Sequence, residues 1–225
     1  MKNPHAEILN TIYDTLYKCY GTQHWWPGET AFEVMLGAVL TQSAAWTNVE
    51  KAIANLKEAG MLSPDALRKI DVERLAKLVY PSGYFNAKAA KLKALVNWYG
   101  SEYGDDLQKL RTRPIGALRD ELLAVYGIGE ETADSILLYA ADKPSFVIDA
   151  YTRRIFQRLG VVPQNDKYSD WRDLFMENLK PDIRKFNEYH ALVVHHGKEV
   201  CSKREPDCES CCLREMCSTG KRRAD

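Results

Sequence analysis

Four cysteines near the C-terminal end of the sequence have the spacing of a metal site. Cys201, Cys208, Cys211 and Cys217 all fall within the last 25 residues. Thiolates brought together by short loops hold either a [4Fe–4S] cluster or a tetrahedral zinc ion, and the spacing alone does not separate the two. In a chain without a secretion signal, such clustering favours a metal over disulfides. We interpret Cys19 and Cys212 as ordinary small hydrophobic residues.

A second candidate for chemistry is the stretch "VYGIGEETADSILLYA", residues 125–140. Its Gly127-Ile128-Gly129 turn lies between two helical segments and could present backbone N–H groups to a phosphate. An ordinary helix–helix turn is the alternative. Two acids, Glu130 and Glu131, follow the turn directly, which is unexpected beside a phosphate. Glu130 is expected to be a solvated acid of the first helical turn.

The third candidate is Asp149, which follows the apolar residues 146–148 and precedes a helical segment. An isolated aspartate at such a place most often caps the helix N-terminus. It becomes a candidate for acid–base chemistry only in combination with other site residues.

The elements that must position these residues are helical. Apolar residues at spacings of three and four begin with Ile8, Leu9, Ile12 and Leu16. The same periodicity, bounded by Gly and Pro, predicts helices at 30–42, 47–59, 71–79, 86–100, 115–124, 130–141, 149–159, 168–179 and 183–197. No alternating strand pair is apparent, so the predicted fold is all-α. The closing "KRRAD" is expected to be a frayed tail.

Composition restricts the class of partner. The 225 residues include 31 basic and 31 acidic ones, so no global field attracts nucleic acid or anionic lipid, and any DNA contact must use local patches. No apolar run reaches the roughly 18 residues of a membrane span, and the first residues lack the apolar core of a secretion signal. We therefore expect a soluble, cytoplasmic protein without a membrane partner.

Taken together, these motifs resemble the endonuclease III, or helix-hairpin-helix, superfamily of DNA glycosylases. The resemblance covers the turn at 127–129, Thr132-Ala133, Asp149 in "VID", the four-cysteine loop, "LGAVLTQSAAWTN" (36–48) and "GYFNAKAAKLKAL" (83–95). It implies two helical domains around a central cleft. One would be a barrel at 32–143 that carries the hairpin, and the other would combine 1–31 with 144–225. It also implies a [4Fe–4S] cluster on the four cysteines and catalysis by Asp149.

One position departs from the strand-cleaving members of that superfamily. Their second residue after the last glycine of the hairpin is a lysine that forms a Schiff base with the sugar. Here that residue is Glu131, and a carboxylate cannot form an imine. We therefore expect Glu131 to line the base pocket opposite Asp149 across the cleft, and the DNA strand to stay intact.

A narrower resemblance is to the helix-hairpin-helix 3-methyladenine DNA glycosylases, through "HWWPGETAFEVMLGAVLTQ", "PSGYFNAKA" and "GIGEETAD". It implies excision of an alkylated purine from double-stranded DNA by a monomer. A cationic base can be selected by stacking on electron-rich rings, for which the candidates are Trp25, Trp26 and Trp46. Gln42 resembles the residue that fills the gap left by a flipped nucleotide, and Lys198 is a candidate for the DNA groove. His195 and His196 are expected to pack or form hydrogen bonds.

Three alternatives stay open at this point. The same frame could serve an endonuclease III-like glycosylase for oxidised or mismatched pyrimidines, with lyase activity included. It could also be a non-catalytic DNA-binding iron–sulfur protein. An iron–sulfur electron carrier would leave the hairpin and the tryptophans unexplained.

Overall fold

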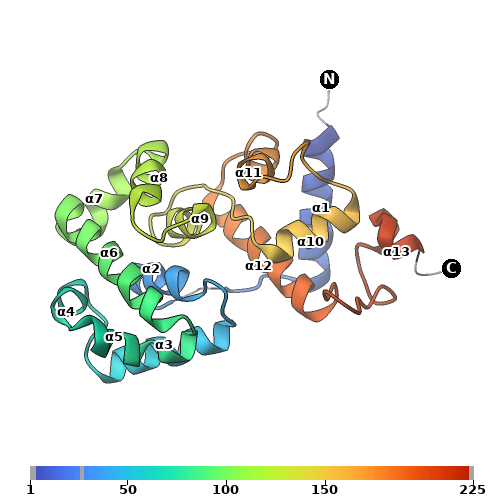
Figure 1. Ribbon diagram of the computed structural model, residues 1–225. Helices are drawn as coiled ribbons and strands as arrows, with labels where there is room; N and C mark the ends of the chain where they lie inside the picture. The colour runs from blue at the N-terminus through green and yellow to red at the C-terminus, as the bar shows by residue number, and fades with distance from the viewer. Residues whose placement is uncertain (1–3, 26–27, 223–225) are drawn as a thin grey trace. The chain divides into compact units, whose positions relative to one another are not determined.

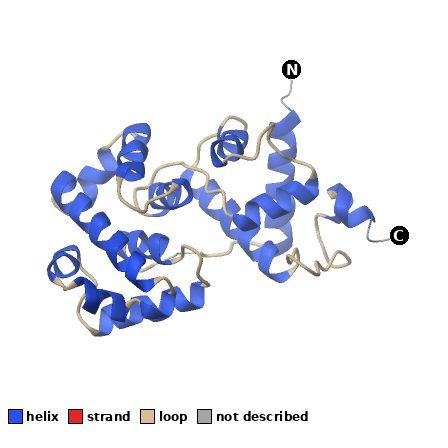
Figure 2. Cartoon of the chain, in the orientation of Figure 1, coloured by secondary structure: helices blue, strands red, loops and turns tan. Residues whose placement is uncertain are grey.

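The computed structural model describes residues 4–25 and 28–222, and these contain helices and loops but no strand (Figure 1, Figure 2). The all-α prediction is confirmed for this part of the chain. Of the helices described, none has the length and apolar character that a bilayer crossing requires.

The chain divides into two compact units. The continuous unit is Trp26–Lys143, and the split unit combines Met1–Trp25 with Pro144–Asp225. The hairpin therefore lies in the continuous unit, whereas Asp149 and the four cysteines lie in the split unit.

The continuous unit is built around a short, almost completely buried helix, α2 (Ala31–Leu40), whose residues from Glu33 to Leu40 are all buried. Thr30 caps its N-terminus by accepting the Glu33 N–H. The surrounding helices are α3 (Trp46–Glu58), α4 (Pro64–Lys69), α5 (Val72–Leu78), the 3₁₀ helix η1 (Tyr80–Ser82), α6 (Phe85–Tyr103), α7 (Leu107–Thr112), α8 (Ile115–Ala124) and α9 (Glu130–Tyr139).

The split unit joins one N-terminal helix to the last third of the chain. Its helices are α1 (Pro4–Tyr20), α10 (Ala150–Leu159), α11 (Tyr168–Met176), α12 (Ile183–Glu199), the 3₁₀ helix η2 (Arg214–Met216) and α13 (Ser218–Arg222). The predicted apolar face of α1 is buried at Leu9, Ile12 and Leu16. Tyr189 of α12 donates its hydroxyl to the Leu9 carbonyl oxygen at 2.8 Å. Helices from opposite ends of the sequence thus share one core.

The predicted helices are all present, with ends that differ by up to three residues. Two short helices, α4 and α7, lie outside every predicted range. Ser63 and Asp106 cap them through side-chain oxygens, so capping rather than apolar periodicity was the signal that could have found them. The expectation of a frayed C-terminal tail is wrong for Lys221 and Arg222, which complete α13. Residues 223–225 lie outside the described part.

Candidate active site

Asp149 is the N-cap of α10. Its Oδ1 accepts hydrogen bonds from the Thr152 amide at 2.7 Å and the Thr152 hydroxyl at 2.8 Å, and its side chain is 14 % exposed. The helix start therefore fixes one carboxylate oxygen and leaves Oδ2 for other contacts.

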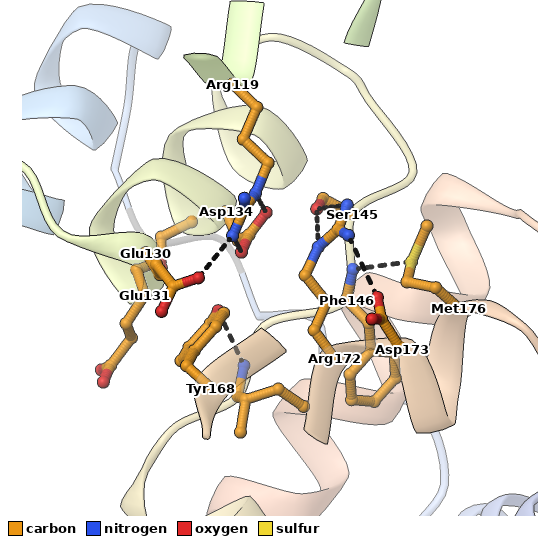
Figure 3. Close-up of polar contacts among 12 residues, drawn as sticks. Arg119, Glu130, Glu131, Asp134, Ser145, Phe146, Tyr168, Arg172, Asp173 and Met176 are labelled. Carbon is orange, nitrogen blue, oxygen red and sulfur yellow. Dashed lines mark hydrogen bonds and ion pairs between the residues drawn. The ribbon is translucent and has the colours of Figure 1, made fainter. Parts of the chain in front are cut away.

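The segment that leads into Asp149 is held by α11 (Figure 3). Arg172 donates to the buried Ser145 hydroxyl at 3.2 and 3.1 Å. The Phe146 amide lies 3.4 Å from the Met176 sulfur, and the Ile148 amide lies 3.3 Å from the Tyr168 hydroxyl. These contacts occupy the backbone just before the carboxylate, which makes its position well defined.

A histidine that we did not identify from the sequence contacts the second carboxylate oxygen. His190 of α12 places Nε2 at 3.5 Å from Asp149 Oδ2. Burial alone would raise the pKa of Asp149, but His190 and the amide and hydroxyl of Thr152 outweigh it and hold the pKa below the ordinary value. Asp149 is therefore an ionised carboxylate at neutral pH.

Trp25 belongs to the same group of residues. Its ring stacks on the His190 imidazole with the centroids 5.3 Å apart and the planes 19° apart. The structure thus brings together two predicted site residues, Trp25 and Asp149, through His190. Trp26 lies outside the described residues. Trp46 is the half-buried first residue of α3 in the continuous unit, and its contact with a base remains a prediction.

The hairpin joins α8 to α9 through a turn in which Gly127 has φ +80° and Gly129 is the N-cap of α9. Ile128 is buried between them. A Cβ on Gly127 would lie 2.3 Å from Cγ of Lys91, so only glycine fits both the backbone conformation and the space.

Gln42 holds this turn in place through hydrogen bonds. Its Nε2 donates to the Gly127 carbonyl at 3.0 Å and to the Thr132 hydroxyl at 2.9 Å, while its Oε1 accepts from Lys91 Nζ at 2.5 Å. Both ends of the amide are therefore engaged within the continuous unit. The predicted contact of Gln42 with a gap in DNA stays a prediction, and would require these bonds to be exchanged.

The two glutamates differ in their surroundings, as Figure 3 shows. Glu130 is not simply a solvated acid, because its Oε1 lies 3.4 Å from Nη2 of Arg119, which also forms two hydrogen bonds with the fully buried Asp134. Glu131 is exposed and its carboxylate points away from Arg119. Arg119 thus ties α8 to α9 through Glu130 and Asp134.

The four cysteines lie on the loop after α12, which α10 fastens in place. Arg158 donates to the Cys201 sulfur at 3.1 Å and to the Ser202 carbonyl at 2.7 Å, and Arg154 donates to the Cys201 carbonyl at 3.0 Å. At the far end of the loop the Gly220 amide lies 3.3 Å from the Cys217 sulfur. N–H donors around the sulfurs are what a cluster ligated by thiolates requires.

The four thiols of the loop affect the ionisation of one another. Burial, together with the nearby Cys201, Cys217 and Cys208, raises the pKa of Cys211 to about 11, so the four thiols influence one another. Yet no three His, Cys, Asp or Glu groups of the described chain are arranged to hold a single metal ion.

The other predicted residues near the loop pack, form hydrogen bonds or are exposed. His196 is buried and shares a 2.7 Å hydrogen bond with the Tyr20 hydroxyl; burial, with the charges of His195 and Arg154, lowers its pKa to about 4. His195 packs edge-on against Tyr20. Cys212 lies 3.9 Å from the Tyr20 hydroxyl. Lys198 is exposed near the end of α12, and its contact with DNA remains a prediction.

Residues 36–181 match the family described as HhH-GPD superfamily base excision DNA repair protein. The chain belongs to this family. A relative from Methanocaldococcus jannaschii, provisionally named a DNA repair glycosylase, is 44% identical over 218 residues, which cover 96% of this chain and 99% of the relative. Endonuclease III of Sulfolobus acidocaldarius is 29% identical over 187 residues, 83% of this chain and 81% of that protein.

Solved structures of HhH-GPD proteins share the fold. Endonuclease III trapped covalently on DNA superposes with a TM-score of 0.84 at 22% identity, covering 98% of this chain and 99% of that one. The 3-methyladenine DNA glycosylase of H. pylori, bound to 1,N6-ethenoadenine, gives a TM-score of 0.73 at 26% identity, covering 87% and 97%. The resemblance to the endonuclease III superfamily is thus confirmed, and the protein is a DNA glycosylase of base excision repair.

Proposed function

We propose that this glycosylase hydrolyses the N-glycosidic bond of a damaged or mismatched base in double-stranded DNA and leaves the strand intact. The observation that carries the proposal is the ionised Asp149 carboxylate, fixed by the start of α10 and by His190. Loss of a base leaves positive charge on the sugar, so a preorganised carboxylate stabilises the oxocarbenium-like transition state. The same carboxylate orients or deprotonates the attacking water.

DNA binding is assigned to the hairpin. The N–H groups of Gly127 and Gly129, just before α9, are suited to donate to a phosphate, because helix N-termini and glycine turns favour anions; the Ile128 N–H already donates to the Val125 carbonyl at 3.1 Å. Such contacts position the duplex without reading its sequence. Lys198 is proposed as a further phosphate contact. The neutral composition means that these local groups, not the net charge, supply the affinity.

The absence of a lyase step is inferred from Glu131. The residue is exposed on the first turn of α9, at the position where strand-cleaving relatives carry their Schiff-base lysine. A carboxylate there cannot make the imine that β-elimination needs. Borohydride should therefore fail to trap the protein on DNA during excision. Efficient trapping would show that another amine performs the lyase step.

For the base itself, an oxidised or mismatched pyrimidine is now favoured over 3-methyladenine. Support comes from the relatives named endonuclease III. An alkylated purine remains the second candidate, supported by the 26% identity to the H. pylori 3-methyladenine DNA glycosylase and by the Trp25 ring, which stacks on the histidine that contacts Asp149. In either case Trp25, Trp46 and Glu131 are each proposed to contact the flipped base, and Gln42 is proposed to fill the gap that the base leaves in the duplex.

A [4Fe–4S] cluster is proposed on Cys201, Cys208, Cys211 and Cys217. The thiol set and its N–H donors fit the group, and the named endonuclease III relatives support it. When bound, the cluster would supply four iron–thiolate bonds that cross-link the loop. Arg154 and Arg158 hold the start of that loop against α10, which begins at the Asp149 cap.

A panel of lesion duplexes tests the proposed function. Duplexes with thymine glycol, a G·T mismatch, or 3-methyladenine should be compared under single-turnover conditions, with release of free base as the readout. At least one pyrimidine substrate should be excised, and Asp149→Asn should abolish excision while it leaves binding to an abasic-site analogue within about twofold. Release of the purine alone would reverse the order of the two candidates. No release from any duplex would instead favour a non-catalytic DNA-binding protein.

A further inference from the structure

We infer that His190 is a positioning residue for Asp149 and that Trp25 holds the imidazole in place for this task. The inference rests on the proposed catalytic role of Asp149. The reasons for it lie entirely within the split unit, in the contacts of three segments: the start of α10, the middle of α12 and the chain that follows α1.

The two oxygens of Asp149 have separate partners. Oδ1 is held by the amide and hydroxyl of Thr152, which belong to the same helix. Oδ2 lies 3.5 Å from Nε2 of His190, which comes from a different helix. Thr152 holds the carboxylate through one oxygen and from its own helix only, whereas the contact of His190 with the other oxygen restrains the same orientation from a second helix. A fixed orientation matters because charge stabilisation of a transition state depends on geometry set before reaction.

His190 is itself firmly placed. It is 6 % exposed and sits on α12 beside Tyr189 and Leu192, both completely buried. Bringing a carboxylate into such surroundings favours its protonated form unless a donor or positive charge compensates. The His190 imidazole, whose Nε2 lies 3.5 Å from Oδ2, supplies that compensation through its electrostatic interaction with the carboxylate. His190 therefore acts through Asp149 and need not touch the substrate.

The Trp25 ring explains how the imidazole keeps its orientation. It covers one face of His190 almost in parallel, at 5.3 Å between centroids, and stacking of this kind is worth about 0.5–1.5 kcal/mol beyond buried area. The chain before it is fastened to the same helix, because the Gln23 amide donates to Oε1 of Glu188 at 2.6 Å. Between them His24 adopts a left-handed conformation, φ +49°, a conformation uncommon outside glycine that the surrounding contacts must hold.

The test uses a donor-retaining and a donor-free substitution. His190→Gln keeps an N–H near the position of Nε2, and His190→Leu removes it at similar volume. On the lesion duplex that the panel shows to be excised fastest, His190→Leu should lower the single-turnover rate about tenfold to a hundredfold. Binding to a duplex with a tetrahydrofuran abasic-site analogue should change less than about twofold, and His190→Gln should recover most of the rate. Trp25→Leu should give an intermediate loss, and Trp25→Phe a smaller one.

Two controls keep the result interpretable. In an Asp149→Asn background, adding His190→Leu should cause no further loss, because the residue that His190 positions has already lost its charge. If His190→Leu fails to fold, His190→Ala replaces it as the donor-free variant, and its rate is compared with that of His190→Gln. A parent rate in His190→Leu, or equal losses in the Gln and Leu variants together with weakened DNA binding, would overturn the inference. Full activity of Asp149→Asn would instead overturn the proposed function.

Discussion

Asp149 combines two tasks that can be separated by substitution. As the N-cap of α10 it accepts the Thr152 amide, and as the proposed catalytic group it must be charged. Asparagine is as good a cap as aspartate, whereas alanine loses about 1 kcal/mol of stability. We predict that Asp149→Asn and Asp149→Ala both abolish excision, and that the alanine variant has the lower free energy of unfolding of the two, measured with urea, because it loses the cap as well as the charge. Equal destabilisation of the two variants would contradict this account of the cap.

The fall in excision rate at low pH, which is the acid limb of the pH–rate profile, should depend on Thr152. Because the folded-state pKa of Asp149 is held below its ordinary value, this group stabilises the fold above the unfolded-state pKa of about 3.9. That contribution is lost as pH falls through the lower folded-state value. Thr152 is completely buried, so Thr152→Val removes only the hydroxyl donor. We predict that the acid limb of the single-turnover rate, recorded from about pH 4 to 8, moves to higher pH in Thr152→Val.

The control for this prediction is a variant with an unrelated hydroxyl lost. Ser135→Ala removes a hydroxyl that donates to the Glu131 carbonyl on α9, and should leave the acid limb where it is. An unchanged limb in Thr152→Val would mean that the Thr152 hydroxyl does not govern the charge of Asp149.

At the scale of elements, the hairpin and α6 form one interlocked unit. Gly127 is at φ +80°, and its Cα faces the methylene stem of Lys91. We predict that Gly127→Ala lowers the free energy of unfolding by about 2 kcal/mol or more, since the left-handed conformation alone costs an alanine about 1–2 kcal/mol and the stem must also move. Lys91→Ala frees the space, so the double variant should lose less than the sum, with a coupling of about 0.5–3 kcal/mol in urea unfolding.

Simple additivity of the two substitutions would refute this coupling. Gly129→Ala serves as the comparison, because nothing lies within 4 Å of a Cβ there and its φ is negative. That variant should lose less stability than Gly127→Ala, because its cost is limited to the poorer capping by alanine.

The features that could be predicted from the sequence are those formed by residues close to one another in the chain. Asp149 follows an apolar run, the glycines of the hairpin are separated by one residue, and the cysteines are separated by short loops, so each could be recognised from local spacing. The long helices have apolar residues at regular intervals, and their positions were predicted to within a few residues. α4 and α7 have six residues each, too few for a periodic pattern to be distinct from chance.

His190 and Lys88 could not be identified from the sequence, because residues that they contact lie far away in the chain. His190 meets a carboxylate 41 positions earlier, and no spacing rule links the two. Lys88 would be assigned to the surface from its type, yet it is 2 % exposed and donates to the Leu40 and Ser82 carbonyls at 2.7 and 2.5 Å. Burial and the charge of Lys91 lower its pKa to about 8. Only tertiary structure shows that a lysine of this kind joins the end of α2 to η1.

For the molecule as a whole, the four-cysteine loop predicts a protein that is brown when purified and contains iron and sulfide. We predict that Cys208→Ser lowers the iron content and raises hydrogen exchange over residues 200–222, while exchange in the continuous unit stays as in the parent. The reason is that iron–thiolate bonds are local cross-links, and without them the loop is held by non-covalent contacts such as those of Arg154 and Arg158. Colourless protein with stoichiometric zinc would contradict the cluster assignment.

The sharing of one core by α1 and α12 has a consequence for synthesis in the cell. The Leu9 carbonyl oxygen finds its partner, the Tyr189 hydroxyl, 180 residues later, so α1 emerges from the ribosome long before the helix that covers it. At typical rates of translation its apolar face, with Leu9, Ile12 and Leu16, waits on the order of ten seconds. The continuous unit emerges during this interval and has its own core, so it can fold first. The nascent chain therefore carries an uncovered amphipathic helix that chaperones must shield until α12 arrives.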